Sequence, residues 1–362
     1  MLADHCLQGV DLADTSGESD LYCSTKHFGY GRLARRKAVC VVQDSILVTG
    51  SSGLIGRAVI ARMAAEIGVR LARFDLLETD PVARADILDH EAVRHALTDI
   101  AGIIHLAGMS RVLWAERSPS TCWQLNVEAT RNILDLALRS PRRPWIIYAS
   151  SREVYGQQAD FPVPETAPLN PMNAYARSKC AAEQLVWHAR DAGLRAAVIR
   201  FSSVYGSVDD HPDRVVPALA FAAAFGGTMR LDGPDCTFDF THVADVARGL
   251  VSVCASLSAG ERSLPPLHFV SGTGTSLREL SEIARSAAPS SRITVTEKPS
   301  RTFDVVHFCG DPRRAAAVLG WQSSIPLRDG ISKLVTDYIA RSTALDLLEP
   351  VDTLARPKSN GV

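Results

Sequence analysis

A turn between an expected strand and an expected helix consists of Thr49-Gly50-Ser51-Ser52-Gly53-Leu54-Ile55-Gly56. Its glycines permit positive φ angles, let the backbone approach a pyrophosphate and allow the helix to pack closely on a sheet. The preceding residues Ile46–Thr49 are apolar and predict a strand, and Leu54–Ile67 has helical periodicity. A glycine-rich turn alone is a weak signal, but this strand–turn–helix context indicates a nucleotide-binding unit.

An acidic residue follows the next predicted strand, Val69–Phe74. This residue, Asp75, lies about 20 residues beyond Gly56, where a carboxylate accepts hydrogen bonds from the adenosine ribose hydroxyls. A carboxylate there repels a 2′-phosphate, so the sequence predicts NAD rather than NADP, although Arg73 is nearby. The alternative for Asp75 is a turn residue that closes the strand.

Further strands and helices alternate along the chain. Apolar runs at 102–106, 144–149 and 196–200 alternate with helix-like segments at 122–138 and 174–189. Such alternation predicts right-handed crossovers and an α/β fold with a Rossmann-type, doubly wound parallel sheet.

The domain organisation follows from where this alternation begins and loosens. Residues 1–43 are polar and then basic without an apolar period, which predicts a poorly ordered extension. We expect an NAD-binding Rossmann domain at 44–200 and a smaller mixed α/β substrate domain at 201–345, with strands that return to the sheet. Residues 346–362 are expected to form a tail.

Composition narrows the class of protein. The 362 residues carry a formal net charge of −1, so no broad basic surface for nucleic acid or anionic membrane is expected. The apolar run Val215–Phe225 is too short to span a membrane and predicts an apolar helix. The eight cysteines show no metal-ligand spacing, which indicates reduced thiols in a cytoplasmic protein without a metal site.

A tyrosine and a lysine four residues apart, Tyr175 and Lys179, lie in the segment expected to be helical. On a helix this spacing places both side chains on one face. An ammonium beside a phenol lowers the phenol pKa from about 10 toward neutrality, which predicts an acid/base group. Ser151 lies between these residues and the glycine turn.

Together these residues resemble the extended short-chain dehydrogenase/reductase family, in its nucleotide-sugar epimerase and dehydratase branch. The resemblance extends from about Ser45 to Tyr338. Besides the glycine turn, it rests on Asp86–Asp89, His105–Gly108, Asn126-Val127, Tyr148–Ser151, Val154–Gly156, Arg200-Phe201, Val204–Gly206, Asp239–Val243, Asp245-Val246 and Leu319–Trp321. The family also forms dimers through two helices, here those after Asn126 and at Tyr175, so a homodimer is expected.

The resemblance implies a mechanism and a cofactor site. Tyr175 would take a proton from a sugar hydroxyl, Lys179 would lower its pKa and hold the nicotinamide ribose, and Ser151 would steady the keto intermediate. The implied NAD contacts are Gly50, Ser52, Gly53, Leu54, Ile55, Gly56, Asp75, Asp86, Ile87, Leu106, Ala107, Gly108, Asn126, Ser150, Tyr175 and Lys179.

Some positions depart from the family pattern. Arg152-Glu153 stands where dehydratases have Asp-Glu, so Glu153 keeps a candidate base or forms an ion pair with a neighbouring arginine. Phe238 replaces an arginine that usually contacts the diphosphate. The remaining substrate-binding candidates are Ser151, Ser203, Arg214 and Arg301. The substrate is therefore an unusual nucleotide sugar or a sugar-like molecule without the diphosphate.

Three functions remain open. The first is NAD-dependent epimerisation of a nucleotide sugar through a transient 4-keto intermediate. The second is decarboxylation, dehydration or net oxidation with Glu153 as an extra base. The third is a non-catalytic NAD sensor, which the presence of Ser151, Tyr175 and Lys179 disfavours because a sensor needs no activated phenol.

Overall fold

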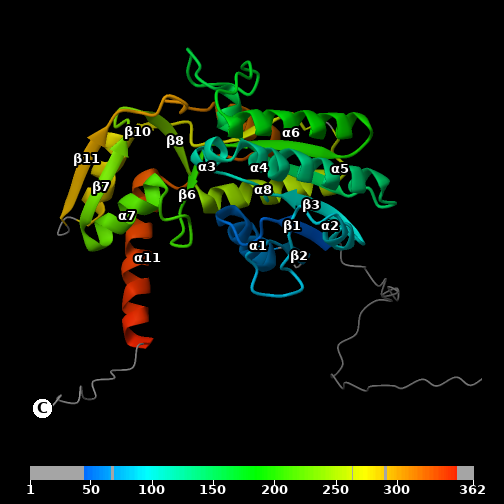
Figure 1. Ribbon diagram of the computed structural model, residues 1–362, viewed down its shortest axis with the longest axis horizontal. Helices are drawn as coiled ribbons and strands as arrows, with labels where there is room; N and C mark the ends of the chain where they lie inside the picture. The colour runs from blue at the N-terminus through cyan, green and yellow to red at the C-terminus, as the bar shows by residue number, and fades with distance from the viewer. Residues whose placement is uncertain (1–44, 67–68, 263, 289–291, 349–362) are drawn as a thin grey trace, which may run out of the picture. The chain divides into compact units, whose positions relative to one another are not determined.

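A six-stranded parallel sheet forms the centre of the protein, and Figure 1 shows its strands among flanking helices. The computed structural model describes residues 45–66, 69–262, 264–288 and 292–348, which belong to one compact unit. The strands are β1 (Ser45–Thr49), β2 (Arg70–Phe74), β3 (Ile100–His105), β4 (Trp145–Ser151), β5 (Ala196–Phe201) and β9 (Leu267–Phe269).

The order of these strands indicates where in the sheet a ligand is expected to bind. It is β2-β1-β3-β4-β5-β9, with every neighbouring pair parallel. From β1 the chain goes first to β2 on one side and then crosses to β3 on the other. In doubly wound sheets, ligands bind beyond the carboxyl ends of the strands at such a reversal. Here those ends are Thr49 and His105, next to the glycine turn.

Helices bury both faces of the sheet. One face packs against α1 (Leu54–Glu66) and α8 (Val243–Ser258), and the other against α2 (His90–Ala96), α5 (Ala129–Arg139) and α6 (Ala174–Asp191). Every residue of β4 is buried. This two-sided burial explains why the central strands are nearly continuous apolar runs rather than alternating ones.

Local sequence sets where two of these helices begin. The Asn173 side chain accepts a hydrogen bond from the Ala176 N–H at 2.8 Å and so caps α6, while Asp89 caps α2. The helix-like segment predicted at 122–138 is present and begins a few residues earlier than expected. The helical run already starts at Pro119 with α4 (Pro119–Trp123), because proline fits a first helical turn, and continues through a π turn, η1 (Gln124–Glu128), into α5.

A second group of elements packs around its own apolar cluster. It contains a three-stranded sheet of order β10-β8-β6, a parallel pair β11-β7, and the apolar helix predicted at Val215–Phe225. Its elements are β6 (Ser203–Tyr205), α7 (Val215–Phe225), β7 (Gly227–Asp232), β8 (Thr237–His242), β10 (Gly274–Ser276), α9 (Leu277–Ala287), β11 (Ile293–Lys298) and α11 (Leu327–Leu348).

Three short helices complete the described chain: α3 (Val112–Arg117), a 3₁₀ turn η2 (Arg152–Tyr155) and α10 (Arg313–Leu319). The extension expected at 1–43 lies outside the described residues. So does the tail expected at 346–362, apart from positions 346–348, which continue α11.

A buried ion pair joins β5 to α6 beneath the carboxyl edge of the sheet. Arg200 donates from Nε to Glu183 Oε1 at 2.9 Å and from Nη2 to Oε2 at 2.6 Å. Both side chains are almost completely buried. The Ser150 hydroxyl donates to the same carboxylate at 2.5 Å, so β4 is held to α6 as well.

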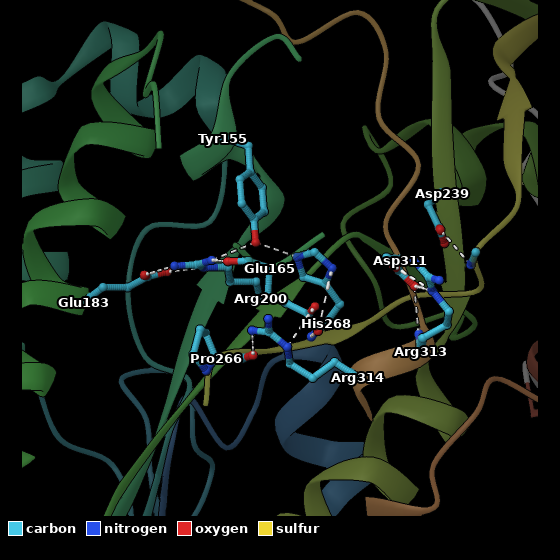
Figure 2. Close-up of polar contacts among 11 residues, drawn as sticks. Tyr155, Glu165, Glu183, Arg200, Asp239, Pro266, His268, Asp311, Arg313 and Arg314 are labelled. Atoms are coloured by element: carbon cyan, nitrogen blue, oxygen red, sulfur yellow. Dashed lines mark hydrogen bonds and ion pairs between the residues drawn. The ribbon is translucent and has the colours of Figure 1, made fainter. Parts of the chain in front are cut away.

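The pair continues into a wider buried network, which Figure 2 shows. Arg200 Nη1 donates to the Tyr155 hydroxyl oxygen at 2.7 Å, and that hydroxyl lies 2.6 Å from His268 Nε2. The Glu165 carboxylate accepts from the His268 N–H at 3.0 Å. Strands β4, β5 and β9, helix α6 and the turn η2 are thus locked into one arrangement.

Replacing Arg200 with methionine should destabilise the protein strongly, because it leaves the Glu183 carboxylate buried without its partner. We expect a loss of about 3–5 kcal/mol in the free energy of unfolding, seen as a lower urea midpoint with an unchanged m value. Adding Glu183→Gln should restore part of the loss. Arg94→Met is the control, because Arg94 forms an exposed pair with Glu91, and its midpoint should not change. An unchanged midpoint for Arg200→Met would contradict this account.

Candidate active site

The glycine turn leaves no room for side chains. Gly50 has φ +72°, and a Cβ on it would lie 2.7 Å from the Ala107 nitrogen. A Cβ on Gly56 would lie 2.2 Å from the Gly50 carbonyl oxygen, and the Gly53 N–H already donates to that oxygen at 3.1 Å. Gly50 and Gly56 therefore allow the turn to pack closely on itself and on the loop after β3, at the N-terminal end of a 13-residue helix, and the N-terminal end of a helix favours a pyrophosphate.

Asp75 lies beside this turn, as the sequence predicts. One carboxylate oxygen accepts from the Ser52 N–H at 3.1 Å, and the other accepts from the Leu77 N–H at 2.8 Å, which closes its own turn. The structure therefore shows the turn interaction of Asp75 and places its carboxylate next to the glycine turn. Arg73 pairs with Glu78 at 3.2 Å and with Asp80 at 3.4 Å, so its charge is directed toward carboxylates.

The loop after β3 forms the other wall of the glycine turn. The Ala107 N–H donates to the Thr49 hydroxyl at 3.3 Å, and the Met109 N–H donates to the Asn126 amide oxygen at 2.8 Å. Asn126 is buried, and its amide nitrogen donates to Met109 O at 3.1 Å and to Ser178 Oγ at 2.9 Å. Asn126 thus fixes the loop of Leu106, Ala107 and Gly108 relative to α6.

Two neighbouring residues among the implied NAD contacts, Asp86 and Ile87, have different surroundings. Asp86 is exposed, and its carboxylate accepts from the Leu88 N–H at 2.9 Å. Ile87 is buried in the same apolar cluster as Phe74 at the end of β2.

The three predicted catalytic side chains come together at the carboxyl end of β4. Ser151 ends this strand, and its hydroxyl accepts from the Glu153 N–H at 3.2 Å. The Ser151 hydroxyl also acts on the pKa of Tyr175, which it lowers, so the two side chains lie near each other. Lys179 Nζ lies 5.8 Å from the centre of the Tyr175 ring and donates to Ala149 O at 2.8 Å. The helical spacing of Tyr175 and Lys179 therefore places both beside Ser151.

The expected fall in the Tyr175 pKa is not observed. Burial raises the pKa of Tyr175 to about 12, although the Ser151 hydroxyl and the charge of Arg214 act in the opposite direction. Burial also lowers the pKa of Lys179 to about 8. Desolvation dominates because the Tyr175 side chain is enclosed, and the Lys179 ammonium donates its hydrogen bond to Ala149 O. In the protein alone, Tyr175 is a protonated phenol at neutral pH.

Glu153 forms the ion pair that the sequence left open. Its Oε1 lies 2.9 Å from Arg152 Nη2, and its Oε2 accepts from the Asn173 amide nitrogen at 3.1 Å. The carboxylate is buried, and its charge contributes to the raised pKa of Tyr175. With a cation on one oxygen and an amide on the other, Glu153 is held as a paired anion rather than as a free base.

Of the predicted substrate-binding residues Arg214, Ser203 and Arg301, only Arg214 is linked to Tyr175. Arg214 precedes α7, donates to Ser110 Oγ at 3.3 Å and acts on the pKa of Tyr175. Ser203 is half-buried on β6. Arg301 donates to the Asp304 carboxylate at 2.6 Å and is 42% exposed, so its charge is taken up by a neighbour in its own loop.

Several residues of the site escaped the sequence analysis. Asn173 links the start of α6 to Glu153 and to Phe303 O, and Glu116 accepts from the Ala174 N–H at 2.6 Å. An asparagine just before a helix is a recognisable capping signal, so Asn173 could have been found. Arg152 stacks on the Phe238 ring, with its Cζ 4.5 Å from the ring centre. No local pattern predicts that contact.

Metal binding and membrane insertion find no support in the residues that the structure describes. Within 45–66, 69–262, 264–288 and 292–348, no three His, Cys, Asp or Glu side chains come close enough together to hold a metal ion. Over the same ranges, no helix combines the length and the apolar character needed to cross a membrane. Cys122, Cys180, Cys236, Cys254 and Cys309 are free thiols.

Comparisons with known proteins identify relatives of this chain and structures that share its fold. The model of the NAD dependent epimerase/dehydratase family matches residues 46–264. A putative UDP-glucose 4-epimerase of Methanocaldococcus jannaschii is 29% identical over 308 residues, which covers 80% of this chain and 97% of the relative. UDP-glucuronic acid decarboxylase 1 of Arabidopsis thaliana is 26% identical over 313 residues, which covers 81% of this chain and 69% of the decarboxylase. The solved structure of MoeE5 in complex with UDP-glucuronic acid and NAD has a TM-score of 0.74 at 26% identity, covering 82% of this chain and 99% of MoeE5.

Proposed function

This chain belongs to the NAD-dependent epimerase/dehydratase family, and we propose that it epimerises a nucleotide sugar through a transient 4-keto intermediate. The observation that carries the proposal is the meeting of Ser151, Tyr175 and Lys179 at the carboxyl end of β4, next to the glycine turn. UDP-glucose 4-epimerases are among its relatives, which supports the same reaction class.

NAD, when bound, supplies the acceptor and then the donor of a hydride. We propose that its pyrophosphate lies over the glycine turn, because the turn leads directly into the N-terminal end of α1, where backbone N–H groups and the helix dipole favour an anion. Asp75 would hold the adenosine ribose. Asn126 and Ser150 would act indirectly, by holding neighbouring residues in position. The full proposed set of NAD-binding residues is Gly50, Ser52, Gly53, Leu54, Ile55, Gly56, Asp75, Asp86, Ile87, Leu106, Ala107, Gly108, Asn126, Ser150, Tyr175 and Lys179.

The remaining chemistry is proton transfer by the side chains of this chain. Tyr175 would exchange a proton with the reacting sugar hydroxyl, and Ser151 would hydrogen-bond the same oxygen. Lys179, on the next turn of α6, would keep a positive charge close to the phenol as it loses its proton. Arg214 would add a second cation, since its charge already favours the phenolate. Ser203 and Arg301 are proposed as more distant substrate contacts.

The alternative reactions are less well supported by the site. Decarboxylation or dehydration with Glu153 as an extra base has a relative in its favour, the UDP-glucuronic acid decarboxylase. However, both oxygens of Glu153 are already engaged, by Arg152 and Asn173. Epimerisation needs no base beyond Tyr175. A non-catalytic NAD sensor would have no use for a buried tyrosine beside Ser151.

We also propose that 44–200 binds the cofactor and 201–345 the substrate, in a cytoplasmic homodimer. Free thiols in the described chain support a reducing compartment, which cell fractionation tests. The dimer would form through α5 and α6, where Leu138 and Leu185 line a shallow groove with charged neighbours. Light scattering should give twice the monomer mass, and a monomer at working concentration would contradict the dimer.

Replacing Tyr175 with phenylalanine should abolish turnover and spare cofactor binding, because only the hydroxyl is removed from a buried ring. We expect turnover of a panel of UDP- and dTDP-hexoses to fall by about 10²- to 10⁴-fold. Calorimetry should give a nearly unchanged dissociation constant for NAD. Tyr338→Phe, on α11, is the control and should keep full activity. Equal activity of Tyr175→Phe and the native protein would exclude the catalytic assignment.

A further inference from the structure

Arg152 is held rigidly beside the catalytic residues. It follows Ser151 directly and begins the turn η2. Its guanidinium lies 4.5 Å from the centre of the Phe238 ring and 5.7 Å from that of Phe308. Contact with aromatic faces fixes the plane of a guanidinium without using its N–H donors. The side chain is only 12% exposed.

The donors of this guanidinium are only partly satisfied. Nη2 pairs with Glu153 Oε1 at 2.9 Å. Nη1 is buried, and it finds no hydrogen-bond acceptor in the part of the chain that the structure describes. A buried guanidinium nitrogen normally has an acceptor, because it loses water on burial. An oxygen atom from a bound ligand could therefore accept the hydrogen bond that Arg152 Nη1 lacks within the described chain.

The position of Arg152 identifies where such an oxygen would come from. Glu153, its ion-pair partner, also binds Asn173 and acts electrostatically on Tyr175, so the arginine belongs to the surroundings of the reacting hydroxyl. A planar guanidinium edge suits the planar carboxylate and the phosphate group better than it suits a neutral hydroxyl. A second cation, Arg214, also acts on Tyr175, although its guanidinium already lies 3.6 Å from the Asp210 carboxylate.

We propose that Arg152 determines substrate specificity by donating from Nη1 to an anionic oxygen of the substrate, on a sugar carboxylate or on the diphosphate. This rests on the proposed function in taking the substrate to be a nucleotide sugar. The guanidinium also stacks on Phe238, which lies on β8 at the position where the family pattern has an arginine. A cation is therefore present next to this position, but it belongs to Arg152, in the turn η2 that follows β4.

The test is the affinity of the NAD-saturated protein for UDP, UDP-glucose and UDP-glucuronic acid, measured by calorimetry. Arg152→Met removes the donors and keeps an apolar stem, and Arg152→Lys keeps the charge without the planar edge. The double variant Arg152→Met/Glu153→Gln avoids leaving Glu153 unpaired. Arg94→Met is the matched control, since it also removes an arginine from an ion pair. Melting temperatures establish that each variant is folded.

The pattern across the three ligands distinguishes the two anions. A roughly 10- to 100-fold loss of affinity for UDP-glucuronic acid alone would assign Arg152 to a sugar carboxylate. A similar loss for all three ligands, UDP included, would assign it to the diphosphate. Unchanged affinities in folded Arg152 variants would overturn the proposal. Equal losses for the two sugars with no loss for UDP would overturn it too, because they indicate a neutral hydroxyl contact.

Failure of the proposed function is recognised separately. If the native protein binds none of the three UDP compounds, the nucleotide-sugar assignment fails. The anion site is then judged from thermal shifts with free glucuronate and with pyrophosphate. A higher melting temperature for the native protein but not for Arg152→Met would support the site, and equal responses of the two proteins would overturn it.

Discussion

The buried pair of Arg200 and Glu183 is the interaction on which the geometry of this site depends. Burying two charges is unfavourable unless their contacts are well aligned and their other donors and acceptors are satisfied. Here the fork-to-fork contact, the Ser150 hydroxyl and the Tyr155 hydroxyl meet that condition. Ser150 precedes Ser151, and Glu183 lies one helical turn beyond Lys179. Any shift of α6 along β4 that misaligned the catalytic residues would therefore also break the ion pair.

The same burial sets the chemistry of the site. Enclosing Tyr175 and Lys179 disfavours the charged form of each, so the pKa of the phenol rises while that of the ammonium falls. The two pKa values, nearly equal for the free side chains, therefore move apart, to about 12 for Tyr175 and about 8 for Lys179. Burial thus favours the neutral form of each group, and loss of the Tyr175 proton depends on positive charge and hydrogen bonds around the phenol. Positive charge from Arg214 and the Ser151 hydroxyl oppose the effect of burial on Tyr175.

Sequence reasoning succeeded where the signal is local. The glycine turn, the strand ending at Asp75 and the four-residue spacing of Tyr175 and Lys179 each depend on neighbours in the chain, and the fold places them as expected. It failed where the outcome depends on distant residues or on the depth of burial. The pKa of Tyr175 moved opposite to the prediction because enclosure could not be judged from spacing. The contact of Arg152 with Phe238 joins two residues far apart in the sequence that no local pattern connects.

The central claim is that one bound NAD is reduced and reoxidised within each turnover. The most direct measurement is to denature the purified protein and identify the released small molecules by mass spectrometry. The account predicts NAD in near-stoichiometric amount, with no NADH accumulating when a nucleotide sugar is added to the native protein. Release of NADP, or a protein that is purified without NAD and accumulates NADH with its substrate, would contradict it.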